Sequence, residues 1–227
     1  MMRNNRNRRQ KKKTFRLNNT RVRAGLAVLA VLTAMMAVRS CVSAGRRNLN
    51  VDASEPAIDV QLLDVNAYSR PGINTDTITG VVIHYTANPG STAQENRDYF
   101  NSLQYTQETE ASSNFVIGLD GEIIQCVPTW EVAYASNERN MDTVSIECCH
   151  PDDSGAFTDE TYRSLVQLTA WLCEKFGLTQ DDVIRHYDVT GKNCPRYFVE
   201  HEDKWIEFKE NVGRAMERSA EEAEEAE

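Results

Sequence analysis

Short apolar runs alternate with amphipathic stretches along residues 58–216, and this pattern predicts strands alternating with helices. The most apolar run is Ile78–Tyr85, which is rich in β-branched residues and typical of a strand buried on both faces. Asp120-Gly121 separates two further runs and predicts a hairpin turn. The other predicted strands are Val60–Val65, Ser113–Leu119, Glu122–Val127, Thr143–Cys149 and Val183–His186.

Three helices are predicted from apolar spacing and from capping signals. The first runs from about Thr92 to Leu103, after overlapping capping-box patterns in Ser91–Glu95. The second runs from Thr158 to Phe176 and ends before a glycine, and the third covers Trp205–Met216. We therefore expect an α/β fold, in which a mixed central β-sheet is flanked by helices in a single domain.

The N-terminal part of the chain differs in charge from the rest. Residues 1–44 hold 11 of the 25 Lys and Arg residues and no acidic residue. Their apolar segment, Ala24–Val38, is shorter than the roughly 20 residues that span a bilayer. A basic stretch followed by such a segment is typical of a secretory signal, with Val42-Ser43-Ala44 as a cleavage site. An uncleaved signal-anchor is the alternative, and both place the main domain outside the cytoplasm, secreted or membrane-anchored.

Beyond this segment we predict a linker over residues 45–57, a catalytic domain over residues 58–216 and an acidic tail over residues 217–227. All 34 acidic residues lie after residue 44. Such a balance is unfavourable for binding nucleic acid, so we expect no nucleic-acid partner. We expect the domain to act as a monomer.

The segment Arg185–Pro195, RHYDVTGKNCP, concentrates three residues that suit metal chemistry in a chain with four histidines. His186 and Cys194 are of the two types that most often bind zinc. His84, at the end of the apolar strand, would complete the three protein ligands of a catalytic zinc, whose fourth position is left for water. The sequence therefore predicts a zinc hydrolase with Zn²⁺ as its cofactor.

Two further residues are candidates for the chemistry. Glu147 lies in an otherwise apolar strand, where a carboxylate is costly unless it has a task or a partner, and it is our candidate base. Lys192 is our candidate for stabilising an oxyanion. Simpler roles remain open: a hydrogen-bonded core histidine at His84, an ion pair at Glu147, and unconnected loop residues at His186 and Cys194.

The remaining cysteines and histidines have simpler interpretations. Cys126, Cys148 and Cys173 lie in apolar runs, which favours buried free thiols over disulfides. His150 and His201 lie in polar contexts and are expected at the surface.

Four stretches resemble one family: VVIHYTANPGSTAQENRDYF, SSNFVIGLDGEIIQCVPTWEVAYA, TVSIECC and RHYDVTGKNCPRYF. Together they cover about residues 78–198. This family is the zinc-dependent N-acetylmuramoyl-L-alanine amidases of type 2. It also includes bacteriophage lysozyme-like amidases and peptidoglycan recognition proteins. The resemblance implies zinc ligands at His84, His186 and Cys194, and catalytic roles for Glu147 and Lys192. It also implies peptidoglycan as the substrate, cut between N-acetylmuramic acid and L-alanine of the stem peptide.

Two positions depart from the family pattern. Asn114 stands where the family often has histidine, and Tyr134-Ala135 stands where it commonly has Trp-His. These positions lie near the family's substrate groove, so Asn114 and Tyr134 are candidate substrate contacts. The departures also keep open a recognition domain that binds peptidoglycan without cutting it. A hydrolase with Cys194 as nucleophile and His186 as base stays open as well, and so does a structural zinc site with a fourth protein ligand.

Overall fold

The computed structural model describes residues 49–225, which belong to one compact unit beginning at Leu49. The apolar segment Ala24–Val38 and the predicted cleavage site lie outside the described residues. Within the described part of the chain, no helix combines the length and the apolar character that crossing a bilayer requires.

A six-stranded mixed sheet forms the centre of this unit, in the order β1-β4-β3-β5-β2-β6. The β3–β4 pair is antiparallel, as expected of the hairpin at Asp120-Gly121, and the other neighbouring strands are parallel. The mixed α/β fold expected from the sequence is thus confirmed. The strands are β1 Asp59–Val60, β2 Gly80–Tyr85, β3 Phe115–Ile117, β4 Ile123–Gln125, β5 Thr143–Cys148 and β6 Val183–Arg185.

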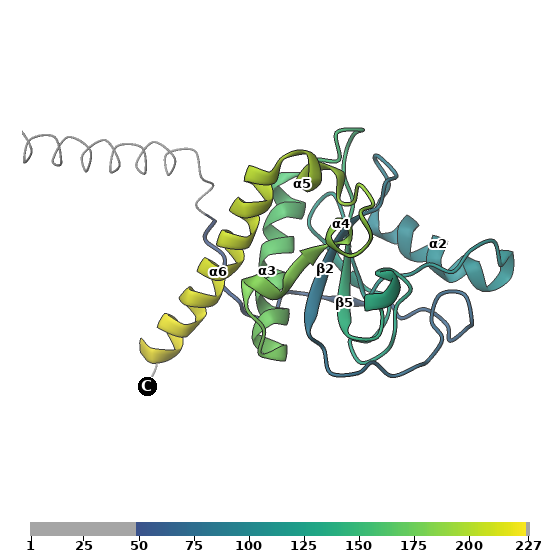
Figure 1. Ribbon diagram of the computed structural model, residues 1–227, viewed down its shortest axis with the longest axis horizontal. Coiled ribbons are helices and arrows are strands. Elements are labelled where there is room, and N and C mark those ends of the chain that lie inside the picture. Colours follow the sequence, from purple (N-terminus) through teal and green to yellow (C-terminus); the bar gives the residue numbers. More distant parts are fainter. Residues whose placement is uncertain (1–48, 226–227) are drawn as a thin grey trace, which may run out of the picture. The chain divides into compact units, whose positions relative to one another are not determined.

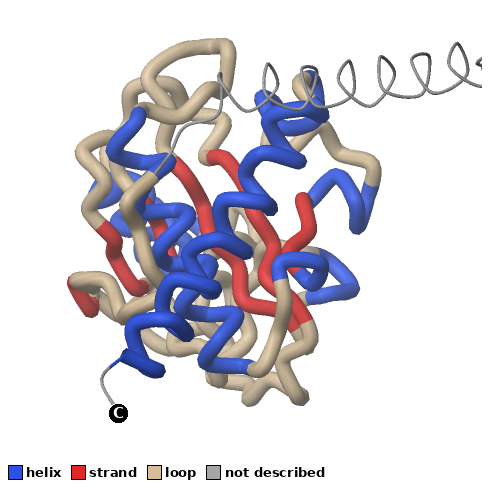
Figure 2. Tube along the Cα trace, turned by 90° about the vertical axis from the view of Figure 1, so that its left-hand side faces the viewer, coloured by secondary structure: helices blue, strands red, loops and turns tan. Residues whose placement is uncertain are grey.

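Helices lie on both faces of the sheet (Figures 1 and 2). One face is covered by α3 and α6, and the other by α2. Short helices and 3₁₀ turns carry the chain between these layers. The helical elements are α2 Ala93–Thr106, η1 Asn137–Arg139, α3 Asp159–Phe176, η2 Gln180–Asp182, α4 His186–Thr190, α5 Arg196–Glu200 and α6 Glu202–Glu225.

Alternation along β2 and β5 decides which side chains meet each layer of helices. Ile83 and Ile146 belong to the apolar core that includes α3 and α6 residues. Because successive side chains point to opposite faces, their neighbours His84 and Glu147 point towards the α2 face. The parallel register places His84 directly beside Glu147. Two polar residues far apart in the chain are thus neighbours at the carboxyl ends of adjacent strands.

Several boundaries differ from those predicted. The apolar run Val60–Val65 forms a strand only at its start, since β1 is Asp59–Val60. The predicted strand end at His186 is instead the first residue of α4, and α5 has no counterpart in the prediction. The long helix α3 ends at Phe176 as predicted. It begins at Asp159, one residue after the predicted start, because Thr158 is its N-cap and its hydroxyl accepts from the Thr161 amide.

The predicted linker and tail both contribute to the folded unit where they are described. Val51 and Ala53 are buried, and the Ala53 amide donates to the Ser219 hydroxyl at 2.7 Å. The Arg218 Nε donates to the Val51 carbonyl at 2.7 Å. Helix α6 therefore continues through most of the acidic segment after Met216, because these bonds tie it to the extended chain that precedes β1.

Cys126, Cys148 and Cys173 are buried free thiols, as predicted. The predicted surface position is correct for His201, which is exposed, and wrong for His150, which is 1% exposed. The His150 ring packs against Tyr85, and its Nδ1 lies 2.7 Å from a backbone carbonyl, so the polar sequence around it does not keep it in solvent.

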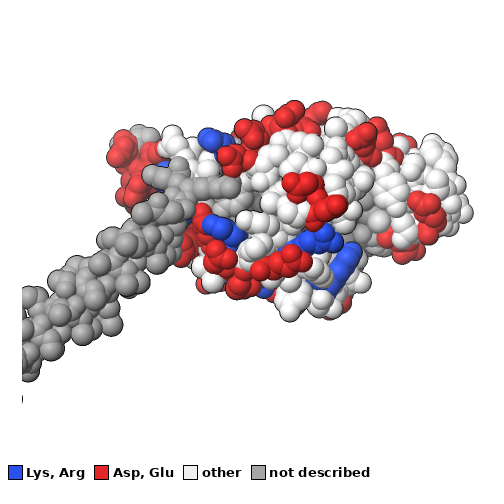
Figure 3. All heavy atoms as spheres, turned by 90° about the horizontal axis from the view of Figure 1, so that it is seen from above, with Lys and Arg blue, Asp and Glu red and all other residues white. Residues whose placement is uncertain are grey.

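Acidic side chains predominate on the face shown in Figure 3, with a few Lys and Arg residues between them. This distribution follows from the composition beyond residue 44, where acidic residues outnumber basic ones. A surface of this sign repels polyanions.

Candidate metal centre

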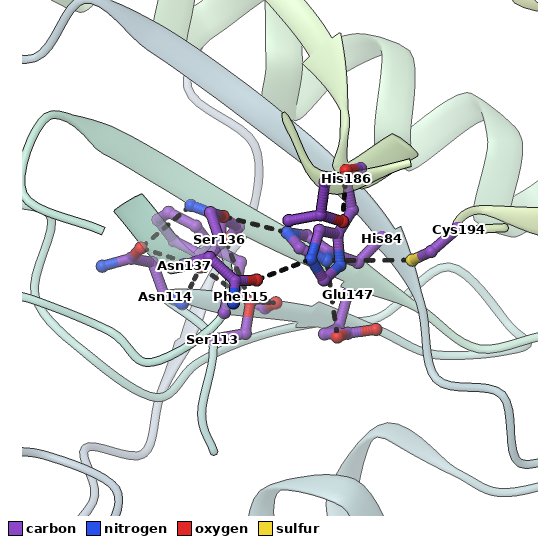
Figure 4. Close-up of polar contacts among 12 residues, drawn as sticks. His84, Ser113, Asn114, Phe115, Ser136, Asn137, Glu147, His186 and Cys194 are labelled. Carbon is purple, nitrogen blue, oxygen red and sulfur yellow. Dashed lines mark hydrogen bonds and ion pairs between the residues drawn. The ribbon is translucent and has the colours of Figure 1, made fainter. Parts of the chain in front are cut away.

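His84, His186 and Cys194 come together at one end of the sheet (Figure 4). Their ligand atoms all lie within 4.8 Å of one another, and each residue is buried. The Cys194 Sγ lies 3.8 Å from the His84 Nδ1, and the two imidazole centroids are 4.7 Å apart. The structure thus brings together the three residues that the sequence proposed as ligands.

A buried arginine organises the segment that carries two of these residues. The Asp188 carboxylate accepts from the Arg185 amide at 2.8 Å and from its guanidinium at 2.9 Å, which closes the turn from β6 into α4. The same guanidinium donates to the Phe198 carbonyl and to Glu202, so it joins α4 to α5 and α6. His186 is therefore held at the first residue of a helix.

The return of the chain to Cys194 depends on a second local feature. Gly191 adopts φ 77°, which favours glycine, and it ends α4. The Tyr187 amide then donates to the Cys194 carbonyl at 2.9 Å. The loop closes back on the start of α4, and this places the thiol near the imidazole of His186.

The outer nitrogen of each imidazole has a hydrogen-bond partner. The His84 Nε2 lies 3.1 Å from the Ser136 hydroxyl, and the His186 Nε2 lies 3.0 Å from the Asn137 Oδ1. Both Nδ1 atoms remain for the centre, and the His186 Nδ1 is buried without a partner among residues 49–225. Ser136 and Asn137 were not predicted from the sequence, where their only signal is a polar run just before a predicted strand.

Two imidazole nitrogens and one sulfur form a donor set that suits zinc. Within residues 49–225 the group contains three ligand residues, the number that leaves a coordination position for substrate or water. A buried imidazole nitrogen without a partner, aimed at a thiol and a second imidazole, is otherwise costly. The residues present therefore fit a catalytic zinc ion.

The protonation states of these groups follow from burial. Burial lowers the pKa of His84 well below its usual value, and it also lowers the pKa of His186. Both rings are therefore neutral near pH 7 and have a lone pair to offer. Burial raises the pKa of the Cys194 thiol to about 12. A divalent cation opposes that rise, because metal binding releases the thiol proton.

Glu147 lies beside the ligand group. Its Oε1 is 4.0 Å from the His84 Nδ1, and its Oε2 is buried without a hydrogen-bond partner in the described part of the chain. Burial raises the pKa of Glu147 to about 8, and the positive charge of Lys192 opposes the rise. A carboxyl group with a pKa near neutrality can both accept and return a proton.

A cavity of about 480 Å³ opens over these residues. Its lining includes the three candidate ligands, Glu147 and Lys192, so the structure assembles all five around one space. Tyr134, a candidate substrate contact, also lines the cavity.

Asn114 lies elsewhere, although the sequence pattern placed it near the substrate. It is buried and is not part of the cavity lining. Its Oδ1 accepts from the Ser145 amide at 2.9 Å, and its Nδ2 donates to the Pro128 carbonyl at 3.1 Å. These bonds tie the hairpin to β5, so the geometry gives Asn114 a structural contact and does not support a substrate contact.

Comparisons with known proteins agree with this geometry. The model of the family described as N-acetylmuramoyl-L-alanine amidase matches residues 74–197, more than half of the chain. The chain is 34% identical over 160 residues to N-acetylmuramoyl-L-alanine amidase CwlL of Bacillus licheniformis, covering 65% of this chain and 44% of that relative. The chain thus spans less than half the length of this curated relative.

Solved structures show the same fold. The structure of PlyL has a TM-score of 0.61 at 20% identity and covers 70% of this chain and 99% of its own. The catalytic domain of XlyA has a TM-score of 0.60 at 26% identity and covers 70% of this chain and all of its own. Together with the family match over the residues that include all three candidate ligands, these findings establish that the chain belongs to the N-acetylmuramoyl-L-alanine amidase family.

Proposed function

We propose that this protein is a zinc-dependent amidase that hydrolyses the amide bond between N-acetylmuramic acid and L-alanine of the peptidoglycan stem peptide. The observation that carries the proposal is the convergence of His84, His186 and Cys194, with Glu147 beside them, in one cavity. Membership of the amidase family supports the choice of bond.

The three ligand residues would hold the ion through two neutral imidazoles and a thiolate. When bound, zinc supplies Lewis acidity, which polarises a carbonyl group and lowers the pKa of water. Side chains of the protein carry out the remaining steps. Glu147 takes a proton from the attacking water and delivers it to the leaving amine, which a pKa raised by burial allows.

Lys192 lines the same cavity, and its positive charge reaches the ligands, since it contributes to lowering the pKa of both His84 and His186. In this proposal it stabilises the negative charge that develops on the carbonyl oxygen. Tyr134, on the cavity wall, contacts the substrate.

A hydrolase with Cys194 as nucleophile is the less favourable alternative. A reactive cysteine needs a thiolate in an exposed, electropositive setting, whereas Cys194 is 2% exposed and its pKa is raised to about 12. A structural zinc site is disfavoured because the described residues offer three ligands and leave one position open.

We also propose that the domain acts outside the cytoplasm, exported by the basic and apolar N-terminal segment, as a secreted or membrane-anchored monomer. Fusing residues 1–44 to a reporter enzyme that is active only after export tests this placement. A reporter that stays inactive in the cytoplasm contradicts it.

The decisive test of the activity is mass spectrometry of a defined muropeptide incubated with the full-length protein and zinc. We expect a free stem peptide that begins with L-alanine and a glycan that keeps its lactyl carboxylate. Chelation should abolish this cleavage. An uncut muropeptide with zinc bound indicates a recognition protein, and cleavage at another bond refutes the assignment.

A further inference from the structure

The outer nitrogens of both candidate ligand histidines contact adjacent residues of one loop. Ser136 faces the His84 Nε2 at 3.1 Å, and Asn137 faces the His186 Nε2 at 3.0 Å. Figure 4 shows these two residues on one side of the imidazole pair and Cys194 on the other. From this geometry we infer that the loop Ser136–Asn140 is a positioning element that sets the tautomer and orientation of both histidines for metal binding.

The partner atoms decide which nitrogen of each ring carries the proton. The Asn137 Oδ1 can only accept a hydrogen bond, so the His186 Nε2 must donate and the His186 Nδ1 keeps its lone pair. The Ser136 hydroxyl can accept from the His84 Nε2 in the same way. Both lone pairs then point into the centre, towards the Cys194 sulfur.

The loop is itself held by hydrogen bonds. The Asn140 Oδ1 accepts from the Ala135 amide at 3.1 Å and from the Ser136 amide at 2.6 Å. The Arg139 carbonyl accepts from the Thr143 hydroxyl at 2.6 Å, which anchors the loop to the start of β5. The positions of the two partner atoms are therefore determined before a metal ion arrives.

The position of Asn137 has a backbone cost. Its φ of 53° lies in the left-handed region, which a non-glycine residue seldom adopts and asparagine tolerates best. A glycine would meet the backbone requirement without strain but would lack the Oδ1 acceptor. Asparagine therefore meets both requirements, since it tolerates the turn and supplies the acceptor for His186.

This inference rests on the proposed zinc function and is tested by zinc binding without substrate. We expect Ser136→Ala to weaken zinc binding by roughly 10- to 100-fold, because it removes a buried partner that solvent cannot replace. Asn137→Gly should weaken binding by about 10-fold, since water can reach this more exposed position. Asn137→Asp keeps the acceptor and should stay near the wild-type affinity.

Ser112→Ala is the matched control. Like Ser136, Ser112 is a buried serine. It lines the cavity, but its hydroxyl accepts from the Tyr134 amide and not from a candidate zinc ligand. We expect this variant to lose folding stability and to keep its zinc affinity. Competition with a chromophoric chelator measures the dissociation constants, and ¹⁵N chemical shifts of the imidazoles report the tautomers in the zinc-free protein.

The outcomes separate this inference from the proposed activity. Wild-type zinc affinity in both Ser136→Ala and Asn137→Gly refutes the positioning role, as does an equal loss in Ser112→Ala. A wild-type protein that binds no zinc overturns both this inference and the zinc-dependent activity. Tight zinc binding that depends on the loop, in a protein that cuts no muropeptide, refutes the activity alone.

Discussion

On the α3 and α6 face of the sheet, apolar side chains such as Ile83, Ile146 and Phe208 pack without exposure to solvent. On the α2 face, the same strands present His84 and Glu147, and several buried polar atoms there have no hydrogen-bond partner within residues 49–225. Thr86, Glu147 and His186 each contribute such an atom, and all three line the cavity. One face therefore holds the apolar core of the fold, and the other gathers polar groups around the cavity.

Backbone strain follows the same division. Two of the non-glycine residues with positive φ, Ala87 and Asn137, line the cavity. Strained positions persist where the surrounding structure holds them, and they gather at functional sites. Changes to the candidate ligands, to Glu147 and to their hydrogen-bond partners should therefore alter binding and activity more than stability, whereas changes on the α3 and α6 side should do the reverse.

The largest expected effect is the loss of a ligand. Cys194→Ala leaves two imidazoles, and we expect zinc affinity to fall by more than about 1000-fold, since a structural or catalytic zinc site needs three or four protein ligands. Without zinc, the Cys194→Ala variant should unfold at nearly the same denaturant concentration as the zinc-free wild-type protein. Zinc content after dialysis measures the effect, and a full equivalent of bound zinc in the variant would contradict the ligand assignment.

Glu147→Gln should lower the rate of muropeptide cleavage by about 10²- to 10⁴-fold, because general acid–base catalysis typically contributes that much. Zinc affinity should change little, and stability should be maintained, because the amide has the same shape and no buried charge. Glu55→Gln, an exposed change away from the cavity lining, is the control. Wild-type turnover in Glu147→Gln, measured as released peptide, would rule out the proposed base.

On the opposite face, Phe208→Ala should lower the free energy of unfolding by about 3–5 kcal/mol, the range for removing a buried aromatic side chain. Phe208 stacks on Phe198 at 5.3 Å between centroids and lies near Trp205 and Tyr162. Urea denaturation measures the loss, and zinc affinity of the folded fraction should be retained. A smaller loss in Phe208→Leu would tie the effect to volume.

The smallest expected effect is an increase in the free energy of unfolding, opposite in sign to the effect of Phe208→Ala. Ala87 adopts φ 52°, a conformation that costs an L-residue roughly 1–2 kcal/mol. Ala87→Gly removes this strain. The greater freedom of glycine in the unfolded chain offsets about 0.5–1 kcal/mol of the resulting gain in unfolding free energy. We expect a net gain of about 0.5–1 kcal/mol in unfolding free energy. Ala156→Gly, at a loop position without positive φ, should instead lose stability in the same denaturation experiment.

Much of the site could be predicted from the chain because strand alternation is a local rule. Once each run is a strand, alternation places His84 opposite Ile83 and Glu147 opposite Ile146, and only the tertiary structure decides which helices cover each face. The His186–Cys194 spacing is also local, and it already suggested a zinc donor set. The helix α3 was predicted correctly because its caps and its apolar spacing agree.

Tertiary contacts decided what those local rules could not. Helices α4 and α5 depend on Arg185, which joins residues up to 17 positions apart, and the α6 extension depends on Ser219, which bonds a residue 166 positions away. The partnership of Ser136 and Asn137 with the two histidines likewise spans 52 and 49 positions. Propensity and periodicity carry information about a few neighbouring residues, so contacts of this range arise only once the chain has folded.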